Sequence, residues 1–301
     1  MPITRLAQML ETVQAKPRKR LAAAYANDAH TIEAVHDAMA KGIVDATLVG
    51  DEKVIKSACQ DLGIDPARFT LVHEPNDGKA AAKAVALVRS GECQILMKGL
   101  VSTDKYMRAI LDKEAGLMDP GAILSHVSVI ENPRYPKLLV CGDVAVLPYP
   151  ELKEKLAILN YCVGVAQALG VARPKVALIA ATEQVLPKVQ STVDAAVIAK
   201  MAERGQIKGA FVDGPMALDV AIDPESARTK GIAGDVAGDA DCLVFPNIDA
   251  GNVFYKTCTK LAGCEVAAMV AGAQAPCILS SRGDSVLTKL YSITLAALTA
   301  R

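Results

Sequence analysis

Short apolar segments alternate with segments of helical periodicity, and this alternation limits the possible folds more than any other feature of the chain. Apolar strands are predicted at 20–26, 45–50, 69–73 and 93–97, and helices at 30–41, 52–62 and 79–90. Strands and helices alternating at this pitch predict βαβ units. Because these strands are apolar almost throughout, they favour a mostly parallel sheet that is covered on both faces.

The pattern changes after Gly121. Segments 124–130 and 137–141 flank the polar turn 131–136, which predicts an antiparallel hairpin. Alternation then resumes, with strands predicted at 175–180, 210–213, 242–246, 266–271 and 277–280 and helices at 151–169, 192–204, 252–262 and 285–300. We therefore predict an α/β protein with two lobes and a cleft between them.

Composition excludes several classes of function. The 301 residues include 33 basic and 33 acidic side chains, so nothing favours binding to nucleic acid. The eight cysteines form no C-x-x-C pair, which disfavours a zinc site and favours buried, reduced thiols. Since neither a signal peptide nor an apolar span of about 18 residues is visible, we predict a cytoplasmic protein without membrane contact.

In open α/β folds, ligands bind beyond the carboxyl ends of strands, so the loops there hold the candidate site residues. In the loop MKGLVST, Lys98 and Gly99 follow a strand, and Ser102 and Thr103 stand where a helix begins. A helix start favours an anion, although Ser or Thr there is also an ordinary cap. Arg108 is a candidate for the same site or for a surface salt bridge.

Two further loops are polar. Asp143 follows the strand ending at Cys141, either as a ligand-binding residue or as a turn residue. The loop VFPNIDAGN holds Asn247, Asp249, Gly251 and Asn252. Two Asn and one Asp exceed what one helix cap needs, and glycine permits close approach of the backbone, so binding and structural roles both stay open.

The C-terminal stretch PCILSSRGDS ends an apolar strand in a polar cluster. Ser281 and Asp284 suit the start of the last helix, as a cap and as an acid in the first turn. Arg282 does not, because the positive end of a helix disfavours a cation, whereas its planar fork suits a phosphate or carboxylate ligand. None of the standard nucleotide motifs or the G-x-S-x-G elbow is present.

Together these stretches resemble the phosphate acetyltransferase and phosphate butyryltransferase family. The matching segments lie between about residues 95 and 297 in the family's order: MKGLVSTDKYMRAIL, ILSHVSVI, VCGDVAVLPYPELKEK, VDGPMALDVAI, VFPNIDAGNVFYK and CILSSRGDSVLTKLYSI. MKGLVST, and SSRGDS with TKLYSI, are more similar to the butyryl branch than to the acetyl branch.

The resemblance implies reversible transfer of a short acyl group between coenzyme A and inorganic phosphate, with butyryl favoured and acetyl possible. It implies two three-layer αβα domains, 1–122 plus 273–301 and 123–272, with an interdomain cleft and a fold similar to that of isocitrate and isopropylmalate dehydrogenases. It also implies a homodimer or higher homo-oligomer. Acyl-CoA, phosphate and acyl phosphate are the small-molecule substrates, and no metal or permanently bound cofactor is implied.

The resemblance also gives the candidate residues roles. Ser281 stabilises the oxyanion or positions the thiol, Arg282 binds phosphate, and Asp284 is the candidate thiol base. The acetyl branch has an acidic residue where this chain has Thr288. The substrate-binding candidates are Lys98, Gly99, Ser102, Thr103, Arg108, His126, Asp143, Asn247, Asp249, Gly251, Asn252, Lys256 and Thr288.

Two alternatives belong to other classes. A related domain fused to malic enzymes senses acyl-CoA, so this chain is alternatively a non-catalytic acyl-CoA-binding module. Against this, Ser281, Arg282 and the Lys98 loop are intact. A dehydrogenase of the related fold would need acidic metal ligands and an arginine cluster, neither of which the sequence offers.

Overall fold

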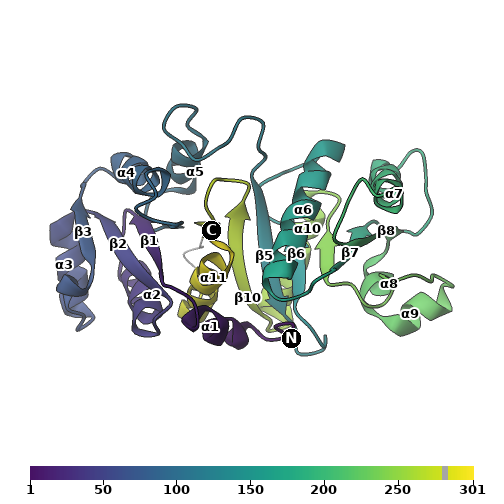
Figure 1. The fold of residues 1–301 in the computed structure, drawn as a ribbon, viewed down its shortest axis with the longest axis horizontal. Helices are drawn as coiled ribbons and strands as arrows, with labels where there is room; N and C mark the ends of the chain where they lie inside the picture. The colour runs from purple at the N-terminus through teal and green to yellow at the C-terminus, as the bar shows by residue number, and fades with distance from the viewer. Residues whose placement is uncertain (280–283) are drawn as a thin grey trace. The chain divides into compact units, whose positions relative to one another are not determined.

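The protein is described by a computed structural model that covers residues 1–279 and 284–301. The chain divides into two compact units, shown in Figure 1 and described one at a time. The N-terminal unit consists of Ala7–Leu124 and Ala267–Arg301, and the central unit consists of Met1–Leu6 and Ser125–Val266.

The N-terminal unit is built on a sheet in which all neighbouring strands are parallel except the last pair. Its strands lie in the order β3 (Thr70–His73), β2 (Val44–Gly50), β1 (Lys19–Ala24), β4 (Ile95–Lys98), β11 (Cys277–Ile278) and β10 (Glu265–Ala271), the start of β10 counting with the central unit. β10 and β11 are antiparallel, with Val270 opposite Cys277. The strands are therefore mostly parallel, as expected, and β1, β2 and β4 are largely buried, whereas β3 is partly exposed.

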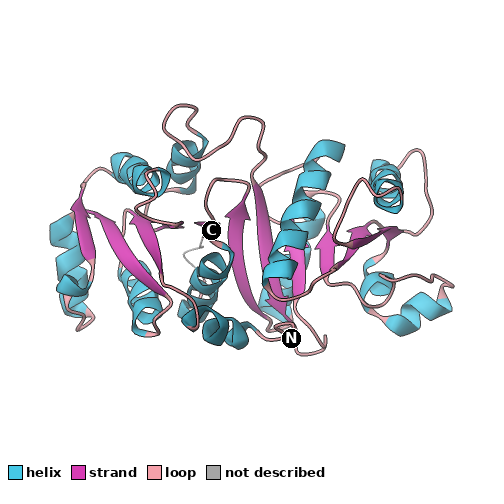
Figure 2. Ribbon diagram, in the orientation of Figure 1, coloured by secondary structure: helices cyan, strands magenta, loops and turns pink. Residues whose placement is uncertain are grey.

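Helices alternate with most strands of this unit (Figure 2). They are α1 (Leu6–Gln14), α2 (Ala29–Ala40), α3 (Glu52–Asp61), α4 (Asp77–Arg89), α5 (Thr103–Leu111) and α11 (Val286–Thr299). Five of them begin at a polar cap, Asp28, Asp51, Asn76, Ser102 or Ser285, whose side chain accepts a hydrogen bond from a backbone N–H of the first turn. α4 packs on β1 and α5, and α2 packs beside α11.

The central unit contains the predicted hairpin at one edge of a second run of strands. The order is β5 (Ser125–Glu131), β6 (Leu139–Gly142), β9 (Cys242–Val244), β7 (Lys175–Ile179) and β8 (Phe211–Met216). β5 and β6 are antiparallel, which confirms the hairpin, and the other neighbours are parallel. Its helices are α6 (Leu152–Ala168), α7 (Gln190–Glu203), α8 (Leu218–Ile222), α9 (Pro224–Thr229) and α10 (Ile248–Lys256), which continues into a π-helical turn, Thr257–Leu261.

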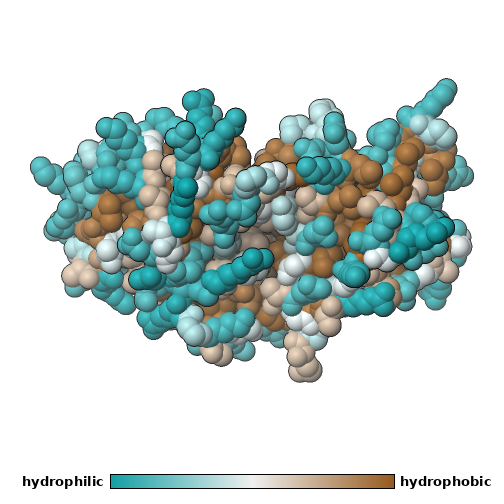
Figure 3. All heavy atoms as spheres, turned by 45° about the horizontal axis from the view of Figure 1, so that its top comes forward, coloured by the Kyte–Doolittle hydropathy of each residue, from teal (hydrophilic) through white to brown (hydrophobic). Residues whose placement is uncertain are grey.

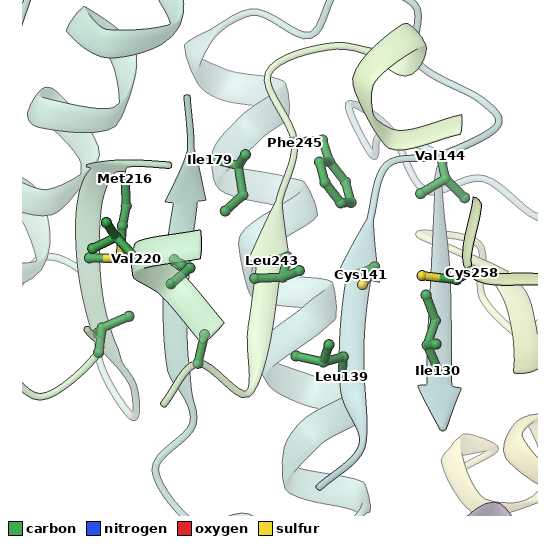
Figure 4. Close-up of a cluster of buried hydrophobic side chains, with 14 of the residues drawn as sticks. Ile130, Leu139, Cys141, Val144, Ile179, Met216, Val220, Leu243, Phe245 and Cys258 are labelled. Atoms are coloured by element: carbon green, nitrogen blue, oxygen red, sulfur yellow. The ribbon is translucent and has the colours of Figure 1, made fainter. Parts of the chain in front are cut away.

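A cluster of buried apolar side chains joins the strands and helices of the central unit (Figure 4). Leu139 and Cys141 of β6, Leu243 of β9 and Met216 of β8 contribute to it, and so does Cys258 after α10. Burial of such side chains stabilises the fold by roughly 1.5–3 kcal/mol each. The cluster fixes the ends of β6 and β9, where the polar loops begin.

The predicted elements differ from the structure in a few places. α10 begins at Ile248 rather than 252, because the side chain of Asn247 caps it by accepting from the N–H of Ala250, at 3.0 Å. The last strand ends at Ile278, not 280. The short helices α8 and α9 and the N-terminal α1 were not predicted.

The surface drawn in Figure 3 mixes hydrophilic and hydrophobic areas. Tyr149, Val253 and Leu261 are among the exposed large apolar side chains. Within the described part of the chain, no helix combines the length and the apolar character needed to cross a membrane.

Candidate active site

Three parallel strand ends meet at one edge of the N-terminal unit. Lys98, the last residue of β4, pairs with Ala24 of β1, and Met97 pairs with Ile278 of β11. The loop after β4 therefore starts beside the chain that leaves β11 at Leu279. Ser281 and Arg282 lie outside the described residues, so their predicted roles rest on the sequence.

Gly99 has a structural reason to be glycine. Its N–H donates to the carbonyl of Ala24, and the N–H of Leu100 donates to the carbonyl of Tyr25, both at 2.9 Å. A Cβ at Gly99 would lie 2.5 Å from that Tyr25 carbonyl oxygen. Tyr25 itself adopts the left-handed φ of 57°, which is uncommon for a residue other than glycine and which no sequence signal predicted. The loop is thus held tightly to the end of β1.

Lys98 is buried at this edge, with 6% of the residue exposed. Its ammonium donates to the carbonyl of Gly99, at 3.3 Å. A lysine is rarely this buried unless its charge is paired with another group. Its place directly at the end of a parallel strand keeps it a candidate for binding an anionic substrate.

Tyr106 is a positioning residue that the sequence analysis did not single out. It is fully buried on α5, and its hydroxyl lies 3.3 Å from the carbonyl oxygen of Leu96 and 3.1 Å from that of Ile278. Burial, together with the nearby Cys277, raises the pKa of Tyr106 well above its usual value, so the phenol stays a neutral donor. The Tyr106 hydroxyl thus links the end of β4 to the end of β11. In the sequence, the only indication of this role is that a tyrosine occurs within a predominantly polar helix.

The polar side chains at the start of α5, which were candidates for binding an anion, form contacts within the helix. Ser102 caps the helix, its hydroxyl accepting from the N–H of Lys105 at 3.3 Å, and Thr103 is the first helical residue. Arg108 forms an exposed ion pair with Asp104, one turn earlier, at 3.1 Å. This geometry matches the capping and surface-pair alternatives that the sequence had left open.

The other described candidates of this unit lie at the start of α11. Asp284 is half-buried and directly precedes Ser285, the cap of the helix. The Ser285 hydroxyl accepts from the N–H of Thr288 and donates to its hydroxyl, both at 3.0 Å. Asp284 is therefore a carboxylate at the start of a long helix.

In the central unit, Asp143 lies in the loop after β6 and is only 2% exposed. One carboxylate oxygen accepts from the hydroxyl of Ser125 and the N–H of His126, at 2.9 and 2.8 Å. The other accepts from the N–H groups of Ala145 and Val146, at 2.7 and 2.8 Å. Since a carboxylate has about four acceptor sites, the fold occupies essentially all of them.

The start of α10 is held against the same loop. A Cβ at Gly251 would lie 2.2 Å from the carbonyl oxygen of Asp143, and the amide of Asn252 donates to the carbonyl of Val144 at 3.0 Å. Asn247 caps the helix. The close approach that Gly251 was expected to permit is thus made by the chain's own backbone.

The remaining candidates of this unit differ in exposure. His126 is buried, with its ring edge-on to that of Tyr255 at 6.3 Å between centroids. Asp249 and Lys256 are exposed on α10, and the Lys256 ammonium lies 5.6 Å from the centre of the Tyr255 ring. The structure therefore brings His126, Asp143, Gly251 and Asn252 together, with Asp249 and Lys256 on the outer side of the helix.

Metal-binding groups do not gather in the described ranges. Among residues 1–279 and 284–301, no three His, Cys, Asp or Glu side chains are arranged to hold a metal ion. All eight cysteines lie in the described ranges, and each is buried and forms no disulfide bond there.

Comparison with known proteins identifies relatives along nearly the whole chain. A family model described as phosphate acetyl/butaryl transferase matches residues 67–297. The chain is 48% identical to a phosphate butyryltransferase of Clostridium acetobutylicum, over 97% of both proteins. It is 40% identical to a phosphate acetyltransferase of Thermotoga maritima, over 97% of this chain and 98% of that protein.

Solved structures give the same result for the fold. A branched-chain phosphotransacylase from Enterococcus faecalis V583 superposes with a TM-score of 0.81 at 30% identity, covering 93% of this chain and 98% of that one. A 4-hydroxythreonine-4-phosphate dehydrogenase from Klebsiella pneumoniae is similar in fold alone, with a TM-score of 0.54 at 13% identity, covering 95% of this chain and 99% of that one.

Proposed function

We propose that this chain, which belongs to the phosphate acetyl/butyryl transferase family and is a phosphate acyltransferase, transfers butyryl in preference to acetyl between coenzyme A and inorganic phosphate. The observation that carries the preference is the higher identity to a phosphate butyryltransferase, 48%, than to a phosphate acetyltransferase, 40%. The relatives reported above are named as enzymes, and they give no support to a non-catalytic acyl-CoA-binding module.

The reaction needs a thiolate, an oxyanion donor and a binding group for phosphate. The CoA thiol, with a pKa of about 8.5, is only a few per cent ionised at neutral pH, so a base assists it. The thiolate attacks the carbonyl carbon of the acyl phosphate, forming the C–S bond and a tetrahedral oxyanion. The C–O bond to phosphate then breaks, and phosphate leaves with the electron pair.

We assign these roles to the candidates that lie between β11 and α11 in the sequence. Arg282 binds the phosphate, Ser281 stabilises the oxyanion or positions the thiol, and Asp284 accepts the thiol proton. Thr288 is a hydroxyl and cannot replace a carboxylate as base. Asp284 is supported by its place at the start of α11, where it directly precedes the cap.

The other parts of the proposal concern substrates and assembly. Buried Lys98 binds an anionic group at the end of β4. Both substrates bind together in a ternary complex, which provides catalysis by orientation. The two domains with a cleft between them, the homodimer or larger oligomer and the cytoplasmic location remain proposals from the sequence resemblance.

Turnover of a substrate series tests the proposal. Phosphate-dependent release of CoA thiol is measured with acetyl-, propionyl-, butyryl- and isobutyryl-CoA. We expect butyryl-CoA to give the highest kcat/KM. Arg282→Ala should lose roughly 100-fold or more, the effect of removing one group that stabilises developing charge. Arg18→Ala, which removes an exposed arginine paired with Asp45 at 3.4 Å, is the matched control.

Two outcomes would contradict parts of this assignment. Tight binding of acyl-CoA without turnover of any substrate would favour the binding module. Near-full turnover of a folded Asp284→Asn variant, with Asp45→Asn as its control, would remove Asp284 from the role of base.

A further inference from the structure

Lys289 is a buried lysine that the proposed mechanism does not use. It is the fourth residue of α11 and is only 4% exposed. Within residues 1–279 and 284–301, its ammonium forms no ion pair and no side-chain hydrogen bond. Lys155, which is similarly buried at 7%, pairs with Asp194 at 2.6 Å. Lys289 is thus a buried cation without a counter-charge in the described part of the protein.

The direction that the Lys289 side of α11 faces can be inferred from Ser292, a neighbour on the same face of the helix. Ser292 lies three residues later, and its hydroxyl accepts from the N–H of Ala268 in β10, at 3.0 Å. This face of the helix therefore packs on the sheet of the N-terminal unit. Residues three apart share a helix face, and their side chains lean toward the helix start.

Because helical side chains lean toward the helix start, the side chain of Lys289 is directed toward one edge of that sheet. Val270 pairs with Cys277 in the antiparallel β10–β11 ladder, so Ala268 lies level with Leu279, at the end of β11. Lys289 is one turn closer than Ser292 to the helix start. A side chain with this lean is directed toward the edge where β11 and β4 end, which is the edge that carries Lys98.

Two physical effects disfavour a cation at this place. Removing an ammonium from water is unfavourable unless an anion compensates it. The start of a helix also carries a partial positive charge, which disfavours a cation in the first turn, where Lys289 is the fourth residue. The ammonium keeps some contact with solvent, but an exposure of 4% for the whole residue leaves it far less water than an ordinary snorkelling lysine has. A negatively charged ligand would offset both effects.

We propose that Lys289 is a further substrate-binding residue, whose ammonium binds a phosphoryl group of a substrate at the carboxyl edge of β4 and β11. This inference rests on the proposed function, because the acyltransferase reaction brings such groups to the protein. The group belongs either to phosphate and acyl phosphate or to the phosphates of CoA. Both sources share the chemistry that Lys289 recognises, and titration with each separates them.

Binding and stability measured on the same variants test the proposal. Lys289→Met keeps the length of the side chain and removes the charge, Lys289→Arg keeps the charge, and Lys56→Met is the control. Lys56 is an exposed lysine of the same unit, paired with Glu52 at 2.6 Å. Calorimetric titrations with inorganic phosphate and with CoA, steady-state KM values and thermal unfolding are measured on the full chain.

We expect Lys289→Met to weaken binding of phosphate or of CoA at least tenfold, with KM for the same substrate raised in parallel. Lys289→Arg should recover most of that loss, and Lys56→Met should bind both as the unchanged protein does. Without ligand, Lys289→Met should unfold at the same temperature as the unchanged protein or higher, because an uncompensated charge has been removed.

Either of two results would overturn the proposal. The first is a folded Lys289→Met variant that binds phosphate and CoA with unchanged affinity. The second is a Lys289→Met variant that fails to fold or unfolds at a clearly lower temperature, since that would reveal a structural partner for the charge. If the unchanged protein turns over no acyl-CoA, the proposed function fails, and the titrations still decide the role of Lys289.

Discussion

Replacing Asp143 by asparagine separates a structural from a ligand-binding role for this buried carboxylate. The two carboxylate oxygens accept four hydrogen bonds, from Ser125, His126, Ala145 and Val146. An asparagine keeps one oxygen and turns an NH₂ group toward two of these donors. If the NH₂ faces the Ser125 hydroxyl, that hydroxyl can rotate to accept, and the N–H of His126 alone loses its partner.

The cost follows from the number of donors left without an acceptor. An unsatisfied buried donor costs about 1–3 kcal/mol, and either orientation of the amide leaves one or two of them. The amide should adopt the orientation that leaves one donor, so we expect a loss of about 1–3 kcal/mol, a considerable part of a domain's usual stability of about 5–15 kcal/mol. At about 2–4 °C for each kcal/mol, the melting temperature falls by roughly 6 °C.

Thermal and urea unfolding followed by circular dichroism measure this loss. Asp249→Asn is the control, because Asp249 is exposed in the first turn of α10 and should cost under about 1 kcal/mol through the helix dipole. If the fold uses the whole Asp143 carboxylate, KM stays unchanged and the apparent kcat falls only with the folded fraction. An Asp143→Asn variant that melts within about 2 °C of the unchanged protein but binds substrate poorly would refute the structural reasoning.

Three further predictions concern the fold. Gly99→Ala, whose Cβ would lie 2.5 Å from the Tyr25 carbonyl oxygen, should lose about 1–3 kcal/mol in urea unfolding. The hydrogen bond from Lys105 lowers the pKa of Asp77, so its stabilisation is present above about pH 4 and disappears as pH falls through the folded pKa; the stability difference from Asp77→Asn should shrink over that range. Burial raises the pKa of thiols such as Cys277, to about 12, and all eight cysteines should resist a thiol reagent at pH 8 until denaturant is added.

The order of elements could be predicted because its signals are local. The hairpin before and after 131–136 is confirmed, as are the parallel strands between helices, since apolar periodicity and turn residues act over a few positions. The start of α10 was wrong by four residues. Several polar residues in a row each suit a cap, and only the bond from Ala250 to Asn247 selects one of them.

The partners of the site residues could not be predicted, because they depend on strand register. Asp143 meets Ser125, 18 residues earlier, and Tyr106 meets Ile278, 172 residues later. The sequence correctly selected the loops after strands as polar, but it does not say which polar atoms the fold itself uses. Only the pairing of β4 with β11 brings the two carbonyls within reach of the Tyr106 hydroxyl.

The hydrogen-bond partners of the candidate residues therefore separate structural from ligand-binding candidates better than residue type does. Polar side chains of the central unit hydrogen-bond to the loop after β6 and to the start of α10, as those of Asp143, Asn247 and Asn252 do. These three residues therefore stabilise the central unit whether or not a substrate is bound. Lys289 is buried, and the described fold gives its charge no partner. A buried charge that the fold leaves uncompensated is best explained by a bound ligand, so Lys289, at the start of α11, is the position where a substitution tests substrate binding most directly.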